Sequence, residues 1–385
     1  WAAMLKRKDR TVRGLRKGIE TLMKSNGIDV LRGTGAFSGH RKVSVVDGDD
    51  AGAELVSRNV IIATGSDSVR PSFIPEADNI LDSRAALSAE TLPERMLVLG
   101  GGVIGCEFAC MYAQLGVDVT LVEMLPQILP SQDADVADVL RKAMRKLGIT
   151  IMTGCRMEDI TSDGREVKAR ADDKDLAADQ LLVCIGRRPY ADGLDLAAAG
   201  LKTNRAGLLE VTDTCRTKAP GIYAIGDMAG AMQYAHRASA MGICAVNHAT
   251  GRRDTMNDRH VPSCIFTRPQ IGAVGLTEKA AGEKGLDYRV GKFPLAALGK
   301  AQILQETEGF CKLVTDARTD QIIGAHIIGP EATNLVAEMA TAMDLEITAE
   351  EAGRSIHAHP TLAESVMEAA HAVHDACIHL PPAGR

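Results

Sequence analysis

The chain has 385 residues, of which 45% are hydrophobic and 24% charged, and its formal net charge is −6. These values are typical of a globular protein of more than one domain, and they give no reason to expect a nucleic acid or another polyanion as partner. No apolar run approaches the about 20 residues that cross a bilayer, no secretory signal opens the chain, and the scattered cysteines favour a reducing compartment, so we expect a cytoplasmic protein without membrane contact.

The N-terminal part is predicted to combine one helix with short strands. Apolar residues recur at helical spacing in the first turns: Leu5, Val12, Leu15, Ile19 and Leu22. Strand-like runs follow at 28–37, 41–46 and 55–62. The last run ends in a turn at Thr64 and Gly65, and its apolar part VIIA favours a strand buried in a parallel sheet. Residues 67–93 carry several prolines and are predicted to connect two domains.

A βαβ unit is predicted at 95–123, where the strand RMLVLG leads through a glycine turn and a helix to the strand VDVTLVE. Further elements are expected in chain order: a helix at 136–147, strands at 149–153, 181–189 and 222–227, and a helix at 238–249. From Pro262 the pattern changes to an antiparallel hairpin at 311–329 and helices that begin near Thr333 and Thr361. We therefore expect boundaries near 90, 212 and 260, with α/β segments before the last boundary and an α+β segment after it.

The βαβ unit carries the spacing of a dinucleotide site. In LVLGGGVIGCE, Gly100 permits a tight turn, Gly102 lets the backbone approach a pyrophosphate, and Gly105 lets the helix pack closely on the strand. Glu123 ends the next strand, where a carboxylate accepts a hydrogen bond from the ribose 2′-hydroxyl and repels a 2′-phosphate. The sequence therefore predicts a dinucleotide site that prefers NAD to NADP.

The stretch HAHPTLAES at 357–365 places two histidines, a proline and a glutamate just before the last predicted helix. Read alone, it fits a helix cap as well as an acid–base site. An imidazole suits proton transfer because its unperturbed pKa is about 6.5 and a neighbouring carboxylate fixes its tautomer.

Four motifs occur in an order and at intervals that resemble the flavin-dependent pyridine nucleotide-disulfide oxidoreductases: GGGVIGCEFACMYAQLGVDVTLVEMLPQILP, CIGRRP, IYAIGD and HAHPTLAES. The resemblance runs over essentially the whole chain. It implies an α/β fold with tandem Rossmann-like FAD- and NAD-binding domains, followed by an α+β dimerisation domain, in a homodimer. The expected domains are a remnant of the FAD-binding domain at 1–90, the NAD-binding domain at 91–212, a central part that completes the FAD domain at 213–260, and the dimerisation domain at 261–385.

The branch of the family that this chain resembles oxidises protein-bound dihydrolipoamide and reduces NAD through FAD and a redox disulfide. The resemblance therefore implies two cofactors, FAD and NAD, and as partners the lipoyl domains of 2-oxoacid dehydrogenase complexes or of the glycine cleavage system. It makes His359 the base and Glu364 the residue that orients it, and it places the pair across the dimer interface from the other subunit's disulfide. No metal site is implied.

The resemblance also assigns cofactor contacts. Residues expected near FAD are Gly35, Thr64, Gly65, Ser66, Asp227, Met232, Gln233, Tyr234 and Ala235. Gly186 and the backbone near Met157 are expected to line the NAD site together with the glycine turn. Glu107 resembles the residue that pairs with a lysine beside the flavin.

Two features of the family are not found in the sequence: a second GxGxxG ahead of Gly100 and a redox pair spaced C-x-x-x-x-C. Cys106 and Cys110 are the nearest candidates, but their spacing on a predicted helix favours packing. We therefore expect that these 385 residues alone bind FAD poorly and do not oxidise dihydrolipoamide.

Several alternatives stay open at this point. Other disulfide reductases and a soluble pyridine nucleotide transhydrogenase use the same scaffold, although glutathione-type members favour NADPH, against which Glu123 argues. A non-catalytic, dimerising, nucleotide-binding remnant is a further alternative from a different class of protein.

Overall fold

The computed structural model describes residues 1–230 and 232–381, so the last residues of the domain expected at 261–385 lie outside the described part. The chain forms two compact units, each assembled from segments that are distant in sequence. The first unit comprises Trp1–Val69, Leu87–Leu92 and Gly186–Asn257, and the second comprises Arg70–Ala86, Pro93–Ile185 and Asp258–Arg385.

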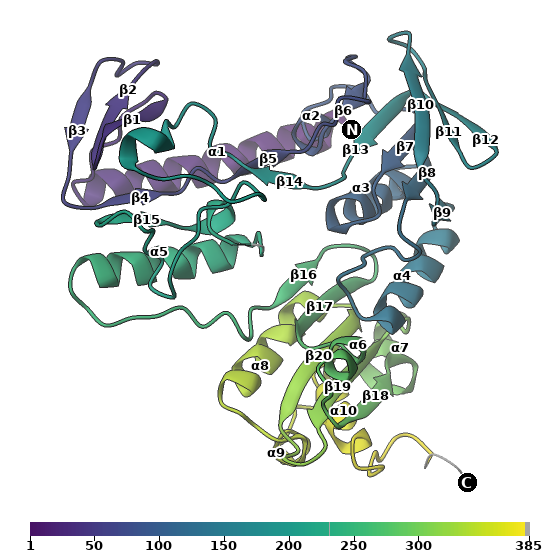
Figure 1. The fold of residues 1–385 in the computed structure, drawn as a ribbon. Coiled ribbons are helices and arrows are strands. Elements are labelled where there is room, and N and C mark those ends of the chain that lie inside the picture. Colours follow the sequence, from purple (N-terminus) through teal and green to yellow (C-terminus); the bar gives the residue numbers. More distant parts are fainter. Residues whose placement is uncertain (231, 382–385) are drawn as a thin grey trace. The chain divides into compact units, whose positions relative to one another are not determined.

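The first unit combines helices with small sheets. Strands β1 (Gly35–Gly39), β2 (Lys42–Val45) and β3 (Glu54–Val56) form an antiparallel sheet in that order. Strand β4 (Val60–Ile62) pairs in parallel with β15 (Ile222–Ala224), and β5 (Ser66–Ser68) pairs antiparallel with β14 (Arg187–Pro189). The helical elements are α1 (Ala2–Ser25), α5 (Ala235–Ala249) and the 3₁₀ turns η1 (Leu196–Ala199) and η2 (Gly226–Met228) (Figure 1). The core of this unit gathers around β15, where Ile222 and Ala224 are fully buried with Met241 and Ala245 of α5.

The second unit contains a parallel sheet of the kind that a dinucleotide fold requires. Its five strands lie in the order β6-β13-β7-β8-β9. They are β6 (Ile80–Leu81), β7 (Arg95–Leu99), β8 (Asp118–Glu123), β9 (Thr150–Thr153) and β13 (Gln180–Val183), with helices α2 (Ser83–Ala86), α3 (Val103–Gln114) and α4 (Ala134–Lys146). Strands β7 and β8 are buried along nearly their whole length, as expected for parallel strands that are covered on both faces.

Two further sheets complete the second unit (Figure 1). A three-stranded antiparallel sheet contains β10 (Met157–Ser162), β11 (Val167–Ala171) and β12 (Lys174–Ala178). A five-stranded antiparallel sheet has the order β16-β17-β20-β19-β18. Its elements are β16 (Ser263–Ile265), β17 (Gln270–Gly275), β18 (Tyr288–Pro294), β19 (Phe310–Asp316) and β20 (Ile322–Gly329), with α6 (Glu278–Glu283), η3 (Leu295–Ala297), α7 (Gly299–Leu304), α8 (Ala332–Asp344), α9 (Ala349–Arg354) and α10 (Glu364–Ala372). Helix α8 packs on β17 and β20, and α10 packs on β18 and β19.

Most predicted elements form, but several predictions about strands need correction. The run predicted at 181–189 is divided into β13 and β14, and the run at 222–227 is a strand only over β15 before η2 begins. The run predicted as one strand at 55–62 is divided into β3 and β4, because β3 pairs with β2 and β4 pairs with β15 in a different sheet; between them the Ser57 hydroxyl donates to the Asn59 carbonyl at 2.8 Å. Only the end of the run at 28–37 is a strand, since β1 begins at Gly35. The antiparallel hairpin predicted at 311–329 is confirmed as β19 and β20.

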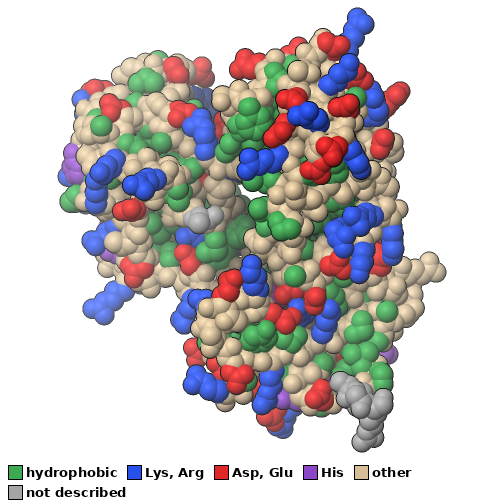
Figure 2. Space-filling model, turned by 45° about the vertical axis from the view of Figure 1, so that its right-hand side comes forward, with side chains coloured by type: hydrophobic (Ala, Val, Ile, Leu, Met, Phe, Trp, Pro, Cys, Tyr) green, Lys and Arg blue, Asp and Glu red, His purple; other side chains and the backbone are tan. Residues whose placement is uncertain are grey.

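Charged side chains of both signs are interspersed over the face shown in Figure 2, in keeping with the small net charge. Among residues 1–230 and 232–381, no helix is long and apolar enough to cross a membrane.

Candidate active site

The glycine turn between β7 and α3 has the geometry of a phosphate cradle. Gly100 has a φ of +107°, and a Cβ there would lie 2.4 Å from the Cys184 carbonyl oxygen. A Cβ on Gly105 would lie 1.9 Å from the Gly100 carbonyl oxygen, so only glycine allows α3 to approach the strand this closely. Gly102 is the N-cap residue of α3, and the space where its Cβ would project is open. The first-turn N–H groups of α3 therefore face a space that a pyrophosphate fits.

Glu123 lies at the end of β8 and faces this turn. One carboxylate oxygen accepts from the Gly101 N–H at 2.6 Å, and the other accepts from the Leu125 N–H at 2.7 Å. The residue is buried, with an exposed fraction of 7%. Each oxygen keeps a lone pair beyond these bonds, so the carboxylate can accept a further hydrogen bond from a ribose hydroxyl.

The other residues expected at the NAD site are placed differently. The side chain of Met157 is buried in the hydrophobic core at the start of β10, so only its backbone is available to a ligand. Gly186 belongs to the first unit, has a φ of +120°, and accepts a hydrogen bond from the Val69 N–H at 3.0 Å.

In the first unit, Ser66 and Asp227, two of the residues expected near FAD, are in contact with each other. The Ser66 hydroxyl donates to Asp227 Oδ2 at 2.5 Å, and it accepts from Arg187 Nε at 2.7 Å. Arg187 also donates to the Ser66 carbonyl at 2.6 Å. One oxygen of Asp227 is thus fixed by Ser66, which leaves the other for a hydroxyl-rich ligand such as a ribityl chain. Sequence reasoning did not single out Arg187, although it stands directly after Gly186 in CIGRRP.

The remaining residues expected near FAD make the following local contacts. Thr64 donates to the Tyr190 carbonyl at 2.5 Å, and Gly65, with a φ of +73°, accepts from the Tyr190 N–H at 2.9 Å. Gly35 begins β1, where a Cβ would make only ordinary contact. Residues 232–234 lead into α5, which begins at Ala235, and the Tyr234 ring stacks on His236.

His359 and Glu364 form an oriented imidazole–carboxylate pair in the second unit. His359 Nδ1 lies 2.8 Å from Glu364 Oε1, and Glu364 Oε2 accepts from the Thr361 N–H at 2.8 Å. Burial acts to raise the pKa of Glu364, but the Thr361 N–H and His359 outweigh it and lower that pKa overall. An ionised Glu364 requires a proton on Nδ1, so Nε2 carries the lone pair, and the imidazole is 78% exposed. The pair can therefore remove a proton from an approaching thiol.

His357 lies two positions before His359, but its ring nitrogens are not available for proton transfer. Its Nδ1 lies 2.9 Å from the Ser355 carbonyl, its Nε2 lies 2.9 Å from Glu338, and its side chain is only 8% exposed. Both ring nitrogens of His357 are therefore used within the fold, whereas the hydrogen-bond contact of His359 is at Nδ1.

Glu107 and the cysteines of α3 complete the set of predicted residues. Glu107 accepts from the Phe266 N–H at 2.8 Å, and burial raises its pKa while the Phe266 N–H opposes that shift. Cys106 and Cys110 are buried free thiols, and burial raises the pKa of both. They are therefore poor nucleophiles, in agreement with the prediction that they pack.

The glycine turn, the His359–Glu364 pair and the Ser66–Asp227 pair are compatible with an oxidoreductase that works with nucleotide cofactors. Residues 2–242 match the family described as pyridine nucleotide-disulphide oxidoreductase, and residues 261–370 match the dimerisation domain of the same family. The chain belongs to the pyridine nucleotide-disulphide oxidoreductase family. FAD and NAD(H) are the cofactors of this family, and the matched dimerisation domain supports a homodimer.

Individual relatives cover nearly the whole chain. A dihydrolipoyl dehydrogenase of Thermus scotoductus is 40% identical over 380 residues, which are 97% of this chain and 81% of that protein. The solved structure of LpdA from Mycobacterium tuberculosis matches with a TM-score of 0.89 at 30% identity and covers 96% of this chain and 83% of that one. The HOCl-induced flavoprotein disulfide reductase RclA from Escherichia coli matches with a TM-score of 0.88 at 29% identity, over 95% and 84% of the two chains.

Proposed function

We propose that this protein oxidises dihydrolipoyl groups of lipoyl domains to lipoyl disulfides and passes the electrons through FAD to NAD. The observation that carries the proposal is the His359–Glu364 pair, with a 2.8 Å contact and an imidazole side chain that is 78% exposed. The names of the relatives supply the substrate class, since the protein of Thermus scotoductus is a dihydrolipoyl dehydrogenase.

In this role His359 Nε2 accepts the proton of a dihydrolipoyl thiol, because the thiolate is the species that attacks a disulfide. Glu364 holds the Nδ1 proton and stabilises the imidazolium that forms. In the homodimer the pair would serve the site of the partner subunit. The disulfide that the thiolate attacks is not found among the nine described cysteines, none of which forms a disulfide bond.

The cofactors would be held by residues of both units. Gly100, Gly102 and Gly105 would bind the pyrophosphate of NAD, and Glu123 would bind the adenosine ribose. The residues proposed to contact FAD are Gly35, Thr64, Gly65, Ser66, Asp227 and 232–235. FAD bound at these residues would supply the two-electron redox chemistry that couples oxidation of the dithiol, through the disulfide, to reduction of NAD. The roles of Gly186, Met157 and Glu107 are further parts of this proposal.

The biological setting is proposed on the same basis. The partners would be lipoyl domains of 2-oxoacid dehydrogenase complexes or of the glycine cleavage system, and the location would be the cytoplasm. The domain boundaries at 90, 212 and 260 are likewise proposed.

The test is to express the complete open reading frame that encodes this sequence and to follow NADH formation from NAD and dihydrolipoamide. We expect flavin absorbance and dithiol-dependent NADH formation that a His359→Gln variant loses. A protein that moves hydride between the two nicotinamide nucleotides but does not oxidise dihydrolipoamide would contradict the proposal and favour a transhydrogenase. A protein that binds NAD but shows neither reaction would favour the non-catalytic alternative.

A further inference from the structure

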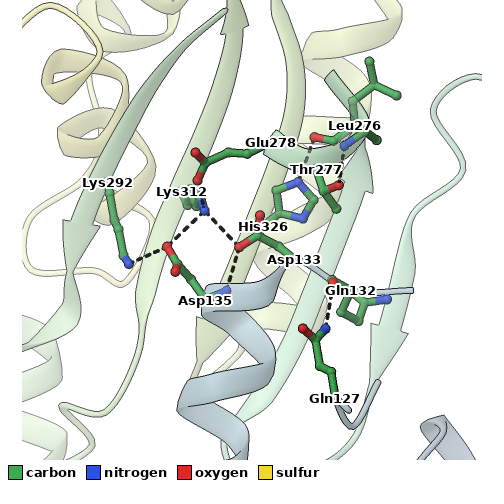
Figure 3. Close-up of polar contacts among 11 residues, drawn as sticks. Gln127, Gln132, Asp133, Asp135, Leu276, Thr277, Glu278, Lys292, Lys312 and His326 are labelled. Atoms are coloured by element: carbon green, nitrogen blue, oxygen red, sulfur yellow. Dashed lines mark hydrogen bonds and ion pairs between the residues drawn. The ribbon is translucent and has the colours of Figure 1, made fainter. Parts of the chain in front are cut away.

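A lysine of the second unit is buried among carboxylates at the start of α4. Lys312 of β19 is 2% exposed, and its Nζ lies 2.9 Å from Asp133 Oδ1 and 3.0 Å from Asp135 Oδ2. A third ion pair joins it to Glu278 (Figure 3). Burial acts to lower the pKa of Lys312, but the hydrogen bonds to Glu278, Asp133 and Asp135 outweigh it and raise that pKa. The ammonium is therefore charged, and each of its three hydrogens has an acceptor.

The surroundings offer no replacement for this ammonium. Lys292 lies 2.8 Å from Asp135, but its side chain is 43% exposed and it is not paired with Asp133. His326 is 2% exposed, its Nε2 donates to the Leu276 carbonyl at 2.9 Å, and burial lowers its pKa while this hydrogen bond opposes the shift. His326 is therefore neutral, and within the described residues its Nδ1 has no hydrogen-bond partner. Among residues 1–230 and 232–381, Lys312 is the cation that pairs with the buried carboxylate of Asp133.

Asp133 links this lysine to the first turn of α4. It is 3% exposed, it is the N-cap residue of the helix, and its side chain accepts from the Asp135 N–H at 3.1 Å. The same Oδ1 atom thus binds both the helix N-terminus and the Lys312 ammonium. Figure 3 shows Lys312 reaching from β19 to the start of α4. Lys312 therefore contacts both the N-cap residue and the first turn of α4.

The segment 124–132 joins β8 to α4 in the chain and contacts the glycine turn at Gly101. Within it, the Leu129 N–H donates to the Gly101 carbonyl at 2.8 Å, while the Gly101 N–H donates to Glu123 at 2.6 Å. Gly101 is thus held on both sides, and a Cβ there would lie 3.1 Å from Ile128 Cγ2. Ile128 and Leu129 are each 1% exposed, and the Gln132 N–H donates to the Leu129 carbonyl at 2.9 Å. The buried residues Ile128, Leu129 and Gln132 therefore link the glycine turn to Asp133, although residues 124–126, 130 and 131 of the same segment are exposed.

We propose that Lys312, although it lies on a strand of the dimerisation sheet, is a positioning residue for the NAD site. Its ammonium holds the carboxylate of Asp133 in place, and Asp133 in turn holds the first turn of α4. The segment 124–132, which is hydrogen-bonded to Gly101, transmits this restraint to the glycine turn. The inference rests on the proposed use of NAD at this turn. It predicts that NAD affinity depends on a residue that does not touch the nucleotide.

The experiment uses the full chain and calorimetric titration with NAD and with ADP-ribose. Lys312→Met keeps the aliphatic stem and removes the charge, and we expect it to weaken both ligands by about tenfold, the size typical of couplings through a packed network. Lys292→Met is the matched control, since it removes the same charge from Asp135 at a half-exposed position, and its effect should stay within about twofold. Equal losses for NAD and ADP-ribose are expected because the turn binds the half of NAD that the two ligands share.

A second variant tests the inference independently in case the Lys312→Met protein does not fold. Asp133→Asn keeps a side chain able to cap α4 but loses the charge pair, so it should weaken NAD in the same direction. The double variant of Lys312 and Asp133 should bind NAD as tightly as the single variant that has the lower affinity, because both changes remove the same ion pair. A purely structural role would lower the unfolding temperature and leave the dissociation constant below that temperature unchanged.

The outcomes separate this inference from the function on which it rests. Wild-type affinity for NAD in a folded Asp133→Asn or Lys312→Met chain would overturn the inference and leave the nucleotide assignment intact. A wild-type chain that binds neither NAD nor ADP-ribose would overturn the nucleotide assignment itself, and the inference with it.

Discussion

Replacing Glu364 by glutamine tests the proposed base most directly. The two oxygens of Glu364 accept from two donors, His359 Nδ1 and the Thr361 N–H, each at 2.8 Å. A glutamine has one acceptor oxygen and an amide group that only donates. If its oxygen stays with Thr361, its NH₂ group faces Nδ1, and the imidazole must carry its proton on Nε2 instead. The lone pair then points at the glutamine and no longer at the substrate.

The expected cost is the loss of correctly directed proton transfer. General acid–base catalysis contributes about 10²–10⁴-fold, so dihydrolipoamide oxidation should slow by that factor, or about 3–5 kcal/mol of activation free energy. The assay is steady-state NADH formation by the complete protein. Electron transfer from NADH to an artificial acceptor should remain, because that reaction requires no thiol deprotonation.

Glu338→Gln provides the matched control. Glu338 lies 2.9 Å from His357 Nε2, so this variant removes a carboxylate from a histidine two positions away, whose side chain is buried. It should leave the turnover number unchanged. The argument fails if Glu364→Gln keeps most of the wild-type activity, or if Glu338→Gln loses as much as Glu364→Gln does.

Three further predictions concern the nucleotide site and pH. Glu123→Arg should shift the ratio of NAD to NADP affinity toward NADP, because a guanidinium pairs with the 2′-phosphate that the carboxylate repels; an unchanged ratio would contradict the role of Glu123. Gly105→Ala should abolish NAD binding measured by titration, since its Cβ would lie 1.9 Å from the Gly100 carbonyl oxygen, and a chain that still binds would show that the turn can adjust. The pKa of Glu364 is lowered by folding, so its stabilising contribution is present above the unfolded pKa of about 4.3 and is lost as the pH falls through the folded value. Glu364→Gln should therefore flatten the dependence of unfolding temperature on pH below about 4.3, and a parallel curve would contradict this.

The sequence predicts those parts of the fold whose determinants are close together in the chain. The βαβ unit at 95–123 follows from apolar periodicity and from Gly100, Gly102 and Gly105, and the contact of His359 with Glu364 spans only five residues. The division of the predicted strand at 55–62 could not be predicted because its two halves pair in different sheets, β3 with β2 and β4 with the distant β15. The alternation of buried Val167, Ala169 and Ala171 with charged neighbours could have revealed β11.

Contacts between distant parts of the chain could not be predicted in this way. Lys312 and Asp133 are separated by 179 positions, and Arg187 and Ser66 by 121. In each case nothing near either residue in the sequence marks the partner, because the register of the strands and the start of a helix bring them together. The role proposed for Lys312 thus depends on topology, whereas the roles of Gly102 and Glu123 are visible in a short motif.

The burial of the cysteines has a consequence for the chemistry of the protein as a whole. Seven of the nine cysteines are buried, and burial raises the pKa of Cys184, for example, to about 12. At neutral pH such sulfurs hold almost no thiolate and are closed to reagents, so they exchange poorly with foreign disulfides. A protein exposed to lipoyl disulfides would otherwise accumulate mixed disulfides on its own scaffold. We therefore infer that the seven buried cysteines take no part in the thiol–disulfide exchange proposed for this protein.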